Sequence, residues 1–242
     1  MSDWFSALTS GSHVTEAVGS ELHTRGFIVI PGPVPAHQMG RLKAGYDAVM
    51  ASATADDIRV GSTTTRVSDL VNRGAECDDL YVYPPLLEAC RRVIGRPFRL
   101  SSLIARTLRP HQPAQGLHVD VRRDSADWPL LGFILMVDEF NPDNGATCFI
   151  PGSHAWPETP QDATPDQSAV GQVPACGHEG SLIVFNGSAW HGHGVNTTSE
   201  PRRSIQGFFM PRDGQAGTDF AARMTPETRA RLSPLAHHLL AL

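Results

Sequence analysis

The sequence predicts a mainly β protein whose core is a sandwich or barrel of the jelly-roll type, with α-helices before and after it. From about residue 98 to residue 212, apolar residues occur in short runs that are rich in β-branched and aromatic side chains. Gly, Pro and Asn separate these runs, and many short strands with such punctuation are typical of sandwiches and barrels. Outside this region, apolar residues recur at helical spacing.

Three helices and one strand are expected ahead of the core. Apolar residues over 14–22 lie on one helical face, and Gly26 follows where a C-terminal cap is expected. A short buried strand at 27–30 ends at a Pro-Gly-Pro turn. Amphipathic helices are expected over 39–49 and 86–94. The polar residues between them, 54–84, are expected to be irregular.

The strands of the core follow in chain order. They are expected over residues 100–108, 130–137, 147–150, 181–185 and 204–210. Residues 155–175, rich in Pro, Gln and Asp, are expected to form a surface excursion, and residues 226–242 to be helical. Because the sequence contains no internal repeat and no linker, residues 1–242 are expected to form a single domain.

Composition excludes several classes of partner. The chain of 242 residues has a net charge of −5 at pH 7 and a pI near 6.1, which argues against binding to nucleic acid or to a membrane surface. No apolar run reaches the roughly 18 residues that span a bilayer, and the N-terminus lacks signal-peptide features. Four scattered cysteines suggest reduced thiols in a cytoplasmic protein. No oligomeric state is predicted.

His118 and Asp120 are the first candidate site residues. They are separated by one apolar residue, so an extended backbone would project both side chains from the same face. A second histidine-bearing strand, with His191 and His193, follows much later in the chain. Two imidazoles and one carboxylate on one face of an octahedral ion leave the opposite face open, which suits non-haem Fe(II). His191 and His193 would share a face, and their spacing does not decide which of them is the ligand.

Arg202 is the candidate for binding an acidic co-substrate. It is expected to begin a strand antiparallel to the one that ends at His191, across a turn at 196–198. A guanidinium there can hold a carboxylate through two parallel hydrogen bonds. Strand alternation places Ser204, Gln206 and Phe208 on the same face. The alternative is that Arg202 and its neighbour form an ordinary solvated basic pair.

Four stretches of the sequence together resemble the phytanoyl-CoA dioxygenase-like family of Fe(II)/2-oxoglutarate oxygenases. These stretches occur in family order, and their combination is far more specific than any one motif. They are Gly-Phe-Ile-Val-Ile-Pro-Gly at 26–32, His-Val-Asp at 118–120, Asn-Gly-Ala-Thr-Cys-Phe-Ile-Pro-Gly-Ser-His at 144–154, and the segment from His191 to Arg203.

The resemblance implies a double-stranded β-helix core with Fe(II) bound by His118, Asp120 and His191. It also implies that Arg202 binds 2-oxoglutarate and that O₂ is the oxidant. His193 then occupies a position where the family often has a small hydroxyl residue near the 2-oxoglutarate carboxylate, and Ile134 a position that is often tryptophan. Because related halogenases carry a small residue in place of Asp120, the resemblance implies hydroxylation of a C–H bond, with release of succinate and CO₂.

The substrate is expected to be a small molecule. Loops at 61–73 and 121–129 are expected to shape its binding site. Arg66 and Arg122 in these loops could bind an anionic group, although both could equally be solvated surface residues. Two other functions fit the same triad. One is a cupin-like isomerase or hydrolase that does not use 2-oxoglutarate, and the other is a metal-stabilised binding barrel without catalysis.

Overall fold

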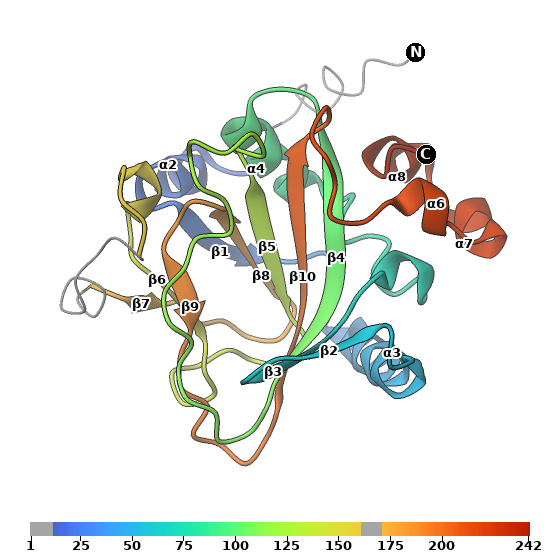
Figure 1. Ribbon diagram of the computed structural model, residues 1–242, viewed down its shortest axis with the longest axis horizontal. Coiled ribbons are helices and arrows are strands. Elements are labelled where there is room, and N and C mark those ends of the chain that lie inside the picture. The colour runs from blue at the N-terminus through green and yellow to red at the C-terminus, as the bar shows by residue number, and fades with distance from the viewer. Residues whose placement is uncertain (1–11, 161–170) are drawn as a thin grey trace.

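Two antiparallel β-sheets enclose the interior of the protein (Figure 1). The computed structural model describes residues 12–160 and 171–242. Within these residues the larger sheet contains, in spatial order, β1 (Phe27–Pro31), β8 (Ser181–Asn186), β5 (Leu131–Met136), β10 (Arg202–Pro211), β4 (Phe98–Leu108), β3 (Thr64–Val67) and β2 (Ile58–Val60). The smaller sheet contains β7 (Val173–Pro174), β6 (Thr147–Phe149) and β9 (His191–His193).

The helices confirm most of the sequence expectations. The three helices ahead of the core are α2 (Glu16–Arg25), α3 (Met39–Ser52) and α4 (Pro84–Ile94). Thr15 caps the start of α2, and Gly26 ends it with a left-handed φ of 81°. The helix predicted over 226–242 is broken in two: after α6 (Phe220–Arg223), the chain forms α7 (Pro226–Arg231) and α8 (Pro234–Leu239). A new hydroxyl cap at Ser233 begins the last of these.

The helices cover the outer face of the larger sheet, and alternation along each strand separates this face from the interior. In β5, Leu131, Phe133 and Leu135 belong to the core that includes apolar residues of α2, α3 and α4. Ile134 and Met136 belong instead to the core inside the jelly roll, with Phe149 of the smaller sheet. β5, in the middle of the larger sheet, is therefore buried on both faces, and residues that project inward can form an enclosed site.

Three expectations about the chain path were wrong or incomplete. Residues 54–84 are not wholly irregular, because β3 pairs with β4 along one edge of the larger sheet. β1 pairs with β8 at the other edge of this sheet. β1 and β3 therefore add residues that precede position 98 to the core, which was predicted to begin there. The predicted surface excursion contributes β7 to the smaller sheet, while its residues 161–170 lie outside the described part of the chain.

Gly207 lies opposite Phe133 in the β10–β5 pair, and its missing side chain leaves room for the aromatic ring. A Cβ atom at position 207 would lie 2.3 Å from Phe133 Cζ and 2.8 Å from the Ser102 carbonyl oxygen. We therefore expect Gly207→Ala to lower the free energy of unfolding by about 1–3 kcal/mol, measured by urea denaturation. The control is Gly40→Ala in α3, where a Cβ atom meets no heavy atom within 4 Å. An unchanged free energy of unfolding in Gly207→Ala would contradict this packing.

No helix in the ranges 12–160 and 171–242 combines the length and apolar character needed to cross a bilayer.

Candidate metal centre

A backbone bridge brings the two histidine-bearing segments side by side. The N–H of His118 donates to the carbonyl of His191 at 2.9 Å, and the N–H of His191 donates back to the carbonyl of His118 at 3.0 Å. The segment around His118 forms this isolated bridge and is not part of a regular strand. The pairing still places residues from distant parts of the sequence against one another.

The side chains of His118, Asp120 and His191 converge on one point. Their ligand atoms all lie within 4.8 Å of one another. His118 Nε2 is 3.9 Å from Asp120 Oδ1, and His191 Nε2 is 3.5 Å from Asp120 Oδ2. These are two nitrogens and one carboxylate, the donor set of a facial iron site. The convergence predicted for the three side chains is therefore present in the fold.

Backbone carbonyls orient both imidazole rings. His191 Nδ1 lies 2.9 Å from the Ala189 carbonyl oxygen, and His118 Nδ1 lies 3.3 Å from that of Gly116. A hydrogen bond at Nδ1 fixes the tautomer whose Nε2 lone pair is free, and ligating histidines usually have such a partner. Both rings thus present an unprotonated Nε2 toward Asp120.

Burial also sets the charge state of the three groups. It lowers the pKa of His118 and of His191 to about 4, and the neighbouring ring of His191 lowers that of His118 further. Burial raises the pKa of Asp120 to about 6. At pH 7 the rings are neutral and the carboxylate is ionised, which is the state that binds a divalent ion.

His193 does not belong to this group of ligand atoms. Its Nε2 lies 2.9 Å from Thr63 Oγ1, and its Nδ1 lies 2.8 Å from the Gly194 carbonyl oxygen. His193 instead forms part of the wall of the cavity beside the three convergent side chains.

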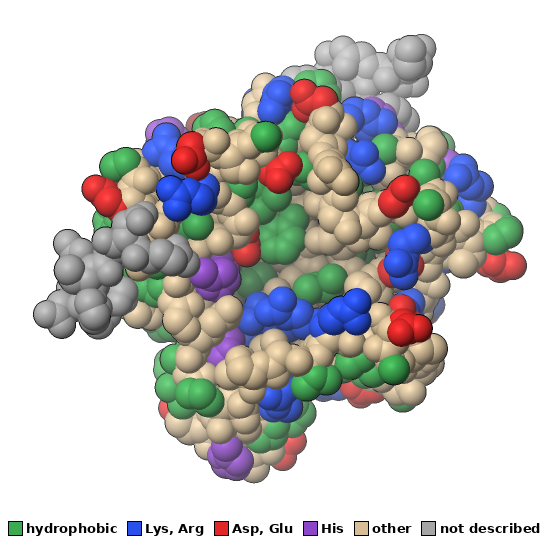
Figure 2. All heavy atoms as spheres, viewed as in Figure 1, with side chains coloured by type: hydrophobic (Ala, Val, Ile, Leu, Met, Phe, Trp, Pro, Cys, Tyr) green, Lys and Arg blue, Asp and Glu red, His purple; other side chains and the backbone are tan. Residues whose placement is uncertain are grey.

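A cavity of about 260 Å³ opens beside the three groups. It corresponds to the hollow near the middle of the face in Figure 2, where apolar side chains lie inside and histidine and basic side chains border it. We call it the metal cavity. Its lining consists of the three convergent residues and Arg66, Ile104, Arg106, Gln115, Phe133, Ile134, Thr147, Phe185, His193, Arg202, Gln206 and Phe208.

Arg202 projects into the metal cavity from the first residue of β10. The residue is 2% exposed, and its guanidinium carbon lies 3.8 Å from the centre of the Phe140 ring. Its Nε and Nη1 atoms are buried and have no hydrogen-bond partner among the described residues. Burial lowers its pKa to about 9, so the group remains charged at neutral pH. A buried cation without an acid partner is costly, and an anionic ligand would relieve that cost.

The strand pairing predicted for Arg202 was wrong. β10 pairs with β4 and β5, whereas the strand of His191, β9, pairs with β6 in the smaller sheet. Arg202 therefore faces the histidines across the interior from the opposite sheet. The predicted alternation is confirmed, because Gln206 and Phe208 also line the metal cavity.

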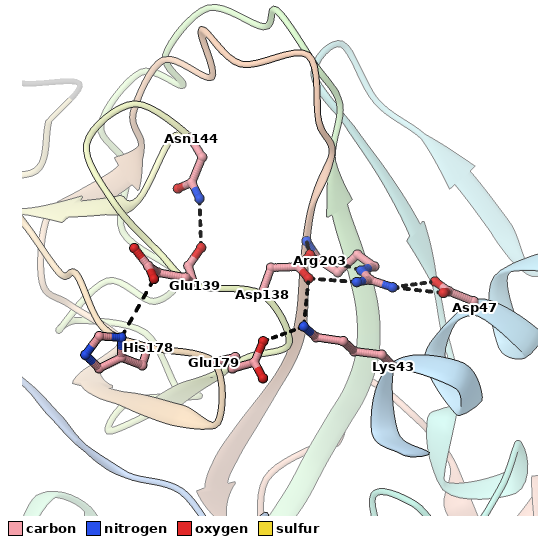
Figure 3. A network of polar contacts seen from close by, with 8 residues as sticks. All are labelled: Lys43, Asp47, Asp138, Glu139, Asn144, His178, Glu179 and Arg203. Carbon is pink, nitrogen blue, oxygen red and sulfur yellow. Dashed lines mark hydrogen bonds and ion pairs between the residues drawn. The ribbon is translucent and has the colours of Figure 1, made fainter. Parts of the chain in front are cut away.

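Arg203, the next residue, projects to the opposite face of the sheet and is fully paired (Figure 3). Its Nε and Nη2 atoms donate to the two carboxylate oxygens of Asp138 at 3.0 and 2.7 Å. Its Nη1 atom donates to Asp47 of α3 at 2.8 and 2.9 Å. Since the Arg203 backbone N–H also donates to Asp138 at 2.8 Å, this network fixes the start of β10 and with it the position of Arg202.

The two arginines suggested for substrate binding lie in different places. Arg66 on β3 lines the metal cavity and is exposed. Arg122 instead donates from Nε to Asp124 Oδ1 at 3.3 Å. It lines a separate groove of about 390 Å³. His154 Nε2 lies 3.0 Å from the carbonyl oxygen of His23, a residue distant in the sequence, so its hydrogen bond is not a local one.

Sequence reasoning missed Arg106 and Gln115 as residues of the metal cavity. Arg106 lies on β4, two residues from Ile104, which also lines the cavity. Strand alternation would have placed the two side chains on one face, but the sequence alone gives no indication that this face is inward. Gln115, three residues before His118, carries no periodic pattern because its segment is irregular.

Solved structures share this fold at low sequence identity. The non-heme alpha ketoglutarate dependent carbocyclase SnoK matches with a TM-score of 0.73 and 16% identity, covering 88% of this chain and 92% of its own. The epimerase SnoN, solved with Fe³⁺, alpha ketoglutarate and nogalamycin RO, matches with a TM-score of 0.69 and 19% identity, covering 85% and 84%. The predicted jelly-roll, cupin-like core is thereby confirmed.

A curated relative and a family model match the sequence itself. Dioxygenase af480 of Aspergillus fumigatus is 29% identical over 182 residues, covering 73% of this chain and 58% of the relative. The chain thus spans a little over half the length of that relative. The model of the phytanoyl-CoA dioxygenase family matches residues 22–204, which include the three convergent side chains and Arg202. This chain belongs to the phytanoyl-CoA dioxygenase (PhyH) family.

Proposed function

We propose that this protein is an Fe(II)- and 2-oxoglutarate-dependent oxygenase that hydroxylates an unactivated C–H bond of a small molecule. One observation carries the proposal: His118, Asp120 and His191 converge at the edge of a cavity that also contains the buried, unpaired guanidinium of Arg202. A metal site alone would not require that cation. A metal site that also binds a dicarboxylate would require a cation to hold the carboxylate remote from the metal.

The residues present fit both groups. Three protein donors would occupy one face of an octahedral Fe(II) and leave the other face to ligands from the cavity. When bound, Fe(II), 2-oxoglutarate and O₂ supply the oxidising chemistry, with release of succinate and CO₂. SnoN, which shares the fold, was solved with Fe³⁺ and alpha ketoglutarate, and this supports the choice of iron and 2-oxoglutarate.

Arg202 would bind the carboxylate of 2-oxoglutarate that is remote from the metal. Its Nε and Nη1 donors are already free, so no internal hydrogen bond has to break. The Phe140 ring holds the guanidinium plane from one side, and the network of Arg203 anchors its backbone. The burial that leaves Arg202 unpaired also excludes water, which strengthens its attraction to a carboxylate.

Hydroxylation is the outcome that the carboxylate of Asp120 favours, because it occupies the ligand position that halogenases leave to chloride. The relatives SnoK and SnoN are named a carbocyclase and an epimerase, so the products must be identified directly. Arg66 is retained as a substrate-binding residue because it lines the cavity. The four unpaired cysteines support a reducing, cytoplasmic location.

The proposal is tested on the purified chain under anaerobic conditions. Addition of Fe(II) and 2-oxoglutarate should produce the weak visible charge-transfer band of the chelate, and admission of O₂ should release succinate. A mass increase of one oxygen atom in a substrate from a small-molecule panel would identify hydroxylation. Absence of both the band and succinate would contradict the proposal. Turnover that requires the metal but not 2-oxoglutarate would favour the cupin-like alternative.

A further inference from the structure

Positive charge in the metal cavity exceeds what the proposed co-substrate can neutralise. Among the described residues that line it, three arginines (Arg66, Arg106 and Arg202) accompany one carboxylate, Asp120. The inference rests on the proposed function, in which the two positive charges of Fe(II) offset the two negative charges of 2-oxoglutarate. The protein then contributes a surplus of two positive charges. Because Arg66 is exposed, the buried part of this surplus is the charge of Arg106, which is unfavourable unless another anion enters.

Arg106 is the least explained of these cations. It projects from β4 directly opposite Arg66 of β3, in a register that places two like charges side by side. Like charges at directly opposite positions destabilise a sheet. Neither arginine forms an ion pair within residues 12–160 and 171–242, whereas Arg203 on the outer face of the sheet pairs with two carboxylates.

Two neutral amides hold the Arg106 guanidinium in place. Its Nη1 atom donates to Gln206 Oε1 at 3.2 Å, and its Nη2 atom donates to Gln115 Oε1 at 3.0 Å. Its Nε atom is buried without a partner in the described structure. The amides orient the group but do not neutralise it, so its full charge remains directed at the cavity. Arg106 lines the same cavity as the three metal ligands, and its partner Gln115 precedes His118 by three residues.

The size of the metal cavity limits what can enter. About 260 Å³ lies at or below the lower end of the range for small-molecule sites. Part of this space must accommodate 2-oxoglutarate. Part of the wall is apolar, formed among others by Ile104, Phe185 and Phe208. A compact aliphatic acid matches such a space, with its carboxylate on the cation and its carbon chain against the apolar side chains.

We propose that the substrate is a small organic acid and that Arg106 selects it by binding its carboxylate, with Arg66 beside it at the cavity mouth. A guanidinium suits this task because two parallel N–H groups match a carboxylate. The bound carboxylate anchors the substrate in the same cavity as the three metal ligands, so a C–H bond of its chain is held near the metal.

The test uses butyrate and butyramide, probes of equal size that differ in charge. Each is titrated calorimetrically into the anaerobic protein saturated with Fe(II) and 2-oxoglutarate. We expect the wild-type chain to bind butyrate at least about tenfold more tightly than butyramide. Arg106→Gln should abolish this preference, and Arg106→Lys should restore part of it. The control is Arg59→Gln on β2, an exposed arginine outside the cavity, which should leave the preference unchanged.

Each contrary result has a distinct meaning. A wild-type chain that binds both probes equally, or binds neither, overturns the inference. A preference for butyrate that survives in Arg106→Gln also overturns it, because the acid is then held elsewhere, for example by the metal. If Arg106→Gln instead weakens 2-oxoglutarate in the charge-transfer titration, Arg106 binds the co-substrate and the inference fails. Absence of both that band and succinate release in the wild-type chain contradicts the proposed function itself.

Discussion

Asp120→Ala should abolish turnover and weaken Fe(II) binding by more than about 100-fold. Loss of a group that merely orients a ligand typically costs 10- to 100-fold in metal affinity, so loss of a ligand should exceed that range. Among the three ligands, only the carboxylate offsets the charge of the ion, because the two imidazoles that remain are neutral. Anaerobic equilibrium dialysis with Fe(II) measures the affinity, and succinate release measures the turnover.

Asp124→Ala is the matched control for this change. Asp124 lies four residues further along the chain, is exposed, and pairs with Arg122 outside the metal cavity. It removes the same charge from the same region, so it separates a ligand effect from a general electrostatic one. Fe(II) affinity should be unchanged in Asp124→Ala. Retention of wild-type affinity in Asp120→Ala would show that the ion is held elsewhere.

Arg202→Ala should weaken 2-oxoglutarate binding while leaving Fe(II) binding nearly intact. A hydrogen bond to a charged group contributes about 1.5–3 kcal/mol, which corresponds to roughly a 10- to 150-fold increase in Kd. Titration of the charge-transfer band under anaerobic conditions measures this Kd. The Kd of Arg202→Lys should lie between those of the wild-type chain and Arg202→Ala. Lysine keeps the positive charge but lacks the paired N–H groups of a guanidinium. An unchanged Kd in Arg202→Ala would refute the role of Arg202.

Stability provides an independent check on the same residue. Arg202 has no hydrogen-bond partner at Nε or Nη1 in the described structure, so its removal leaves no acid unpaired. Arg202→Ala should therefore not lower the free energy of unfolding through a broken ion pair. Arg203→Ala should lower it by about 1–3 kcal/mol, since Asp47 then loses this partner and Asp138 keeps Lys43 at 3.9 Å, in a setting that is only partly buried. Urea denaturation of both variants would show whether the two adjacent arginines differ in this way.

Much of the fold followed from local patterns. Apolar spacing predicted α2, α3 and α4, and the turn residues predicted the principal strands of the core. The strand β3 escaped prediction because Thr64–Val67 is mostly polar and becomes a strand by pairing with β2 and β4. The predicted partner of β10 was also wrong, since β9 and β10 follow one another in the chain but belong to different sheets. Pairing of that kind depends on contacts between distant residues, which no local pattern encodes.

The sequence by itself determined the chemical identity of the site: one imidazole and one carboxylate two residues apart, further imidazoles much later in the chain, and an arginine eleven residues after His191. Only the tertiary structure decided how these groups are used. It placed His191 beside His118 and Asp120, as the family resemblance implied, left Arg202 without an acid while giving Arg203 two, and directed Arg106 into the same cavity. The reason is physical, because donor atoms are properties of residue types, whereas burial and the absence of a partner depend on which surfaces the folded chain brings together.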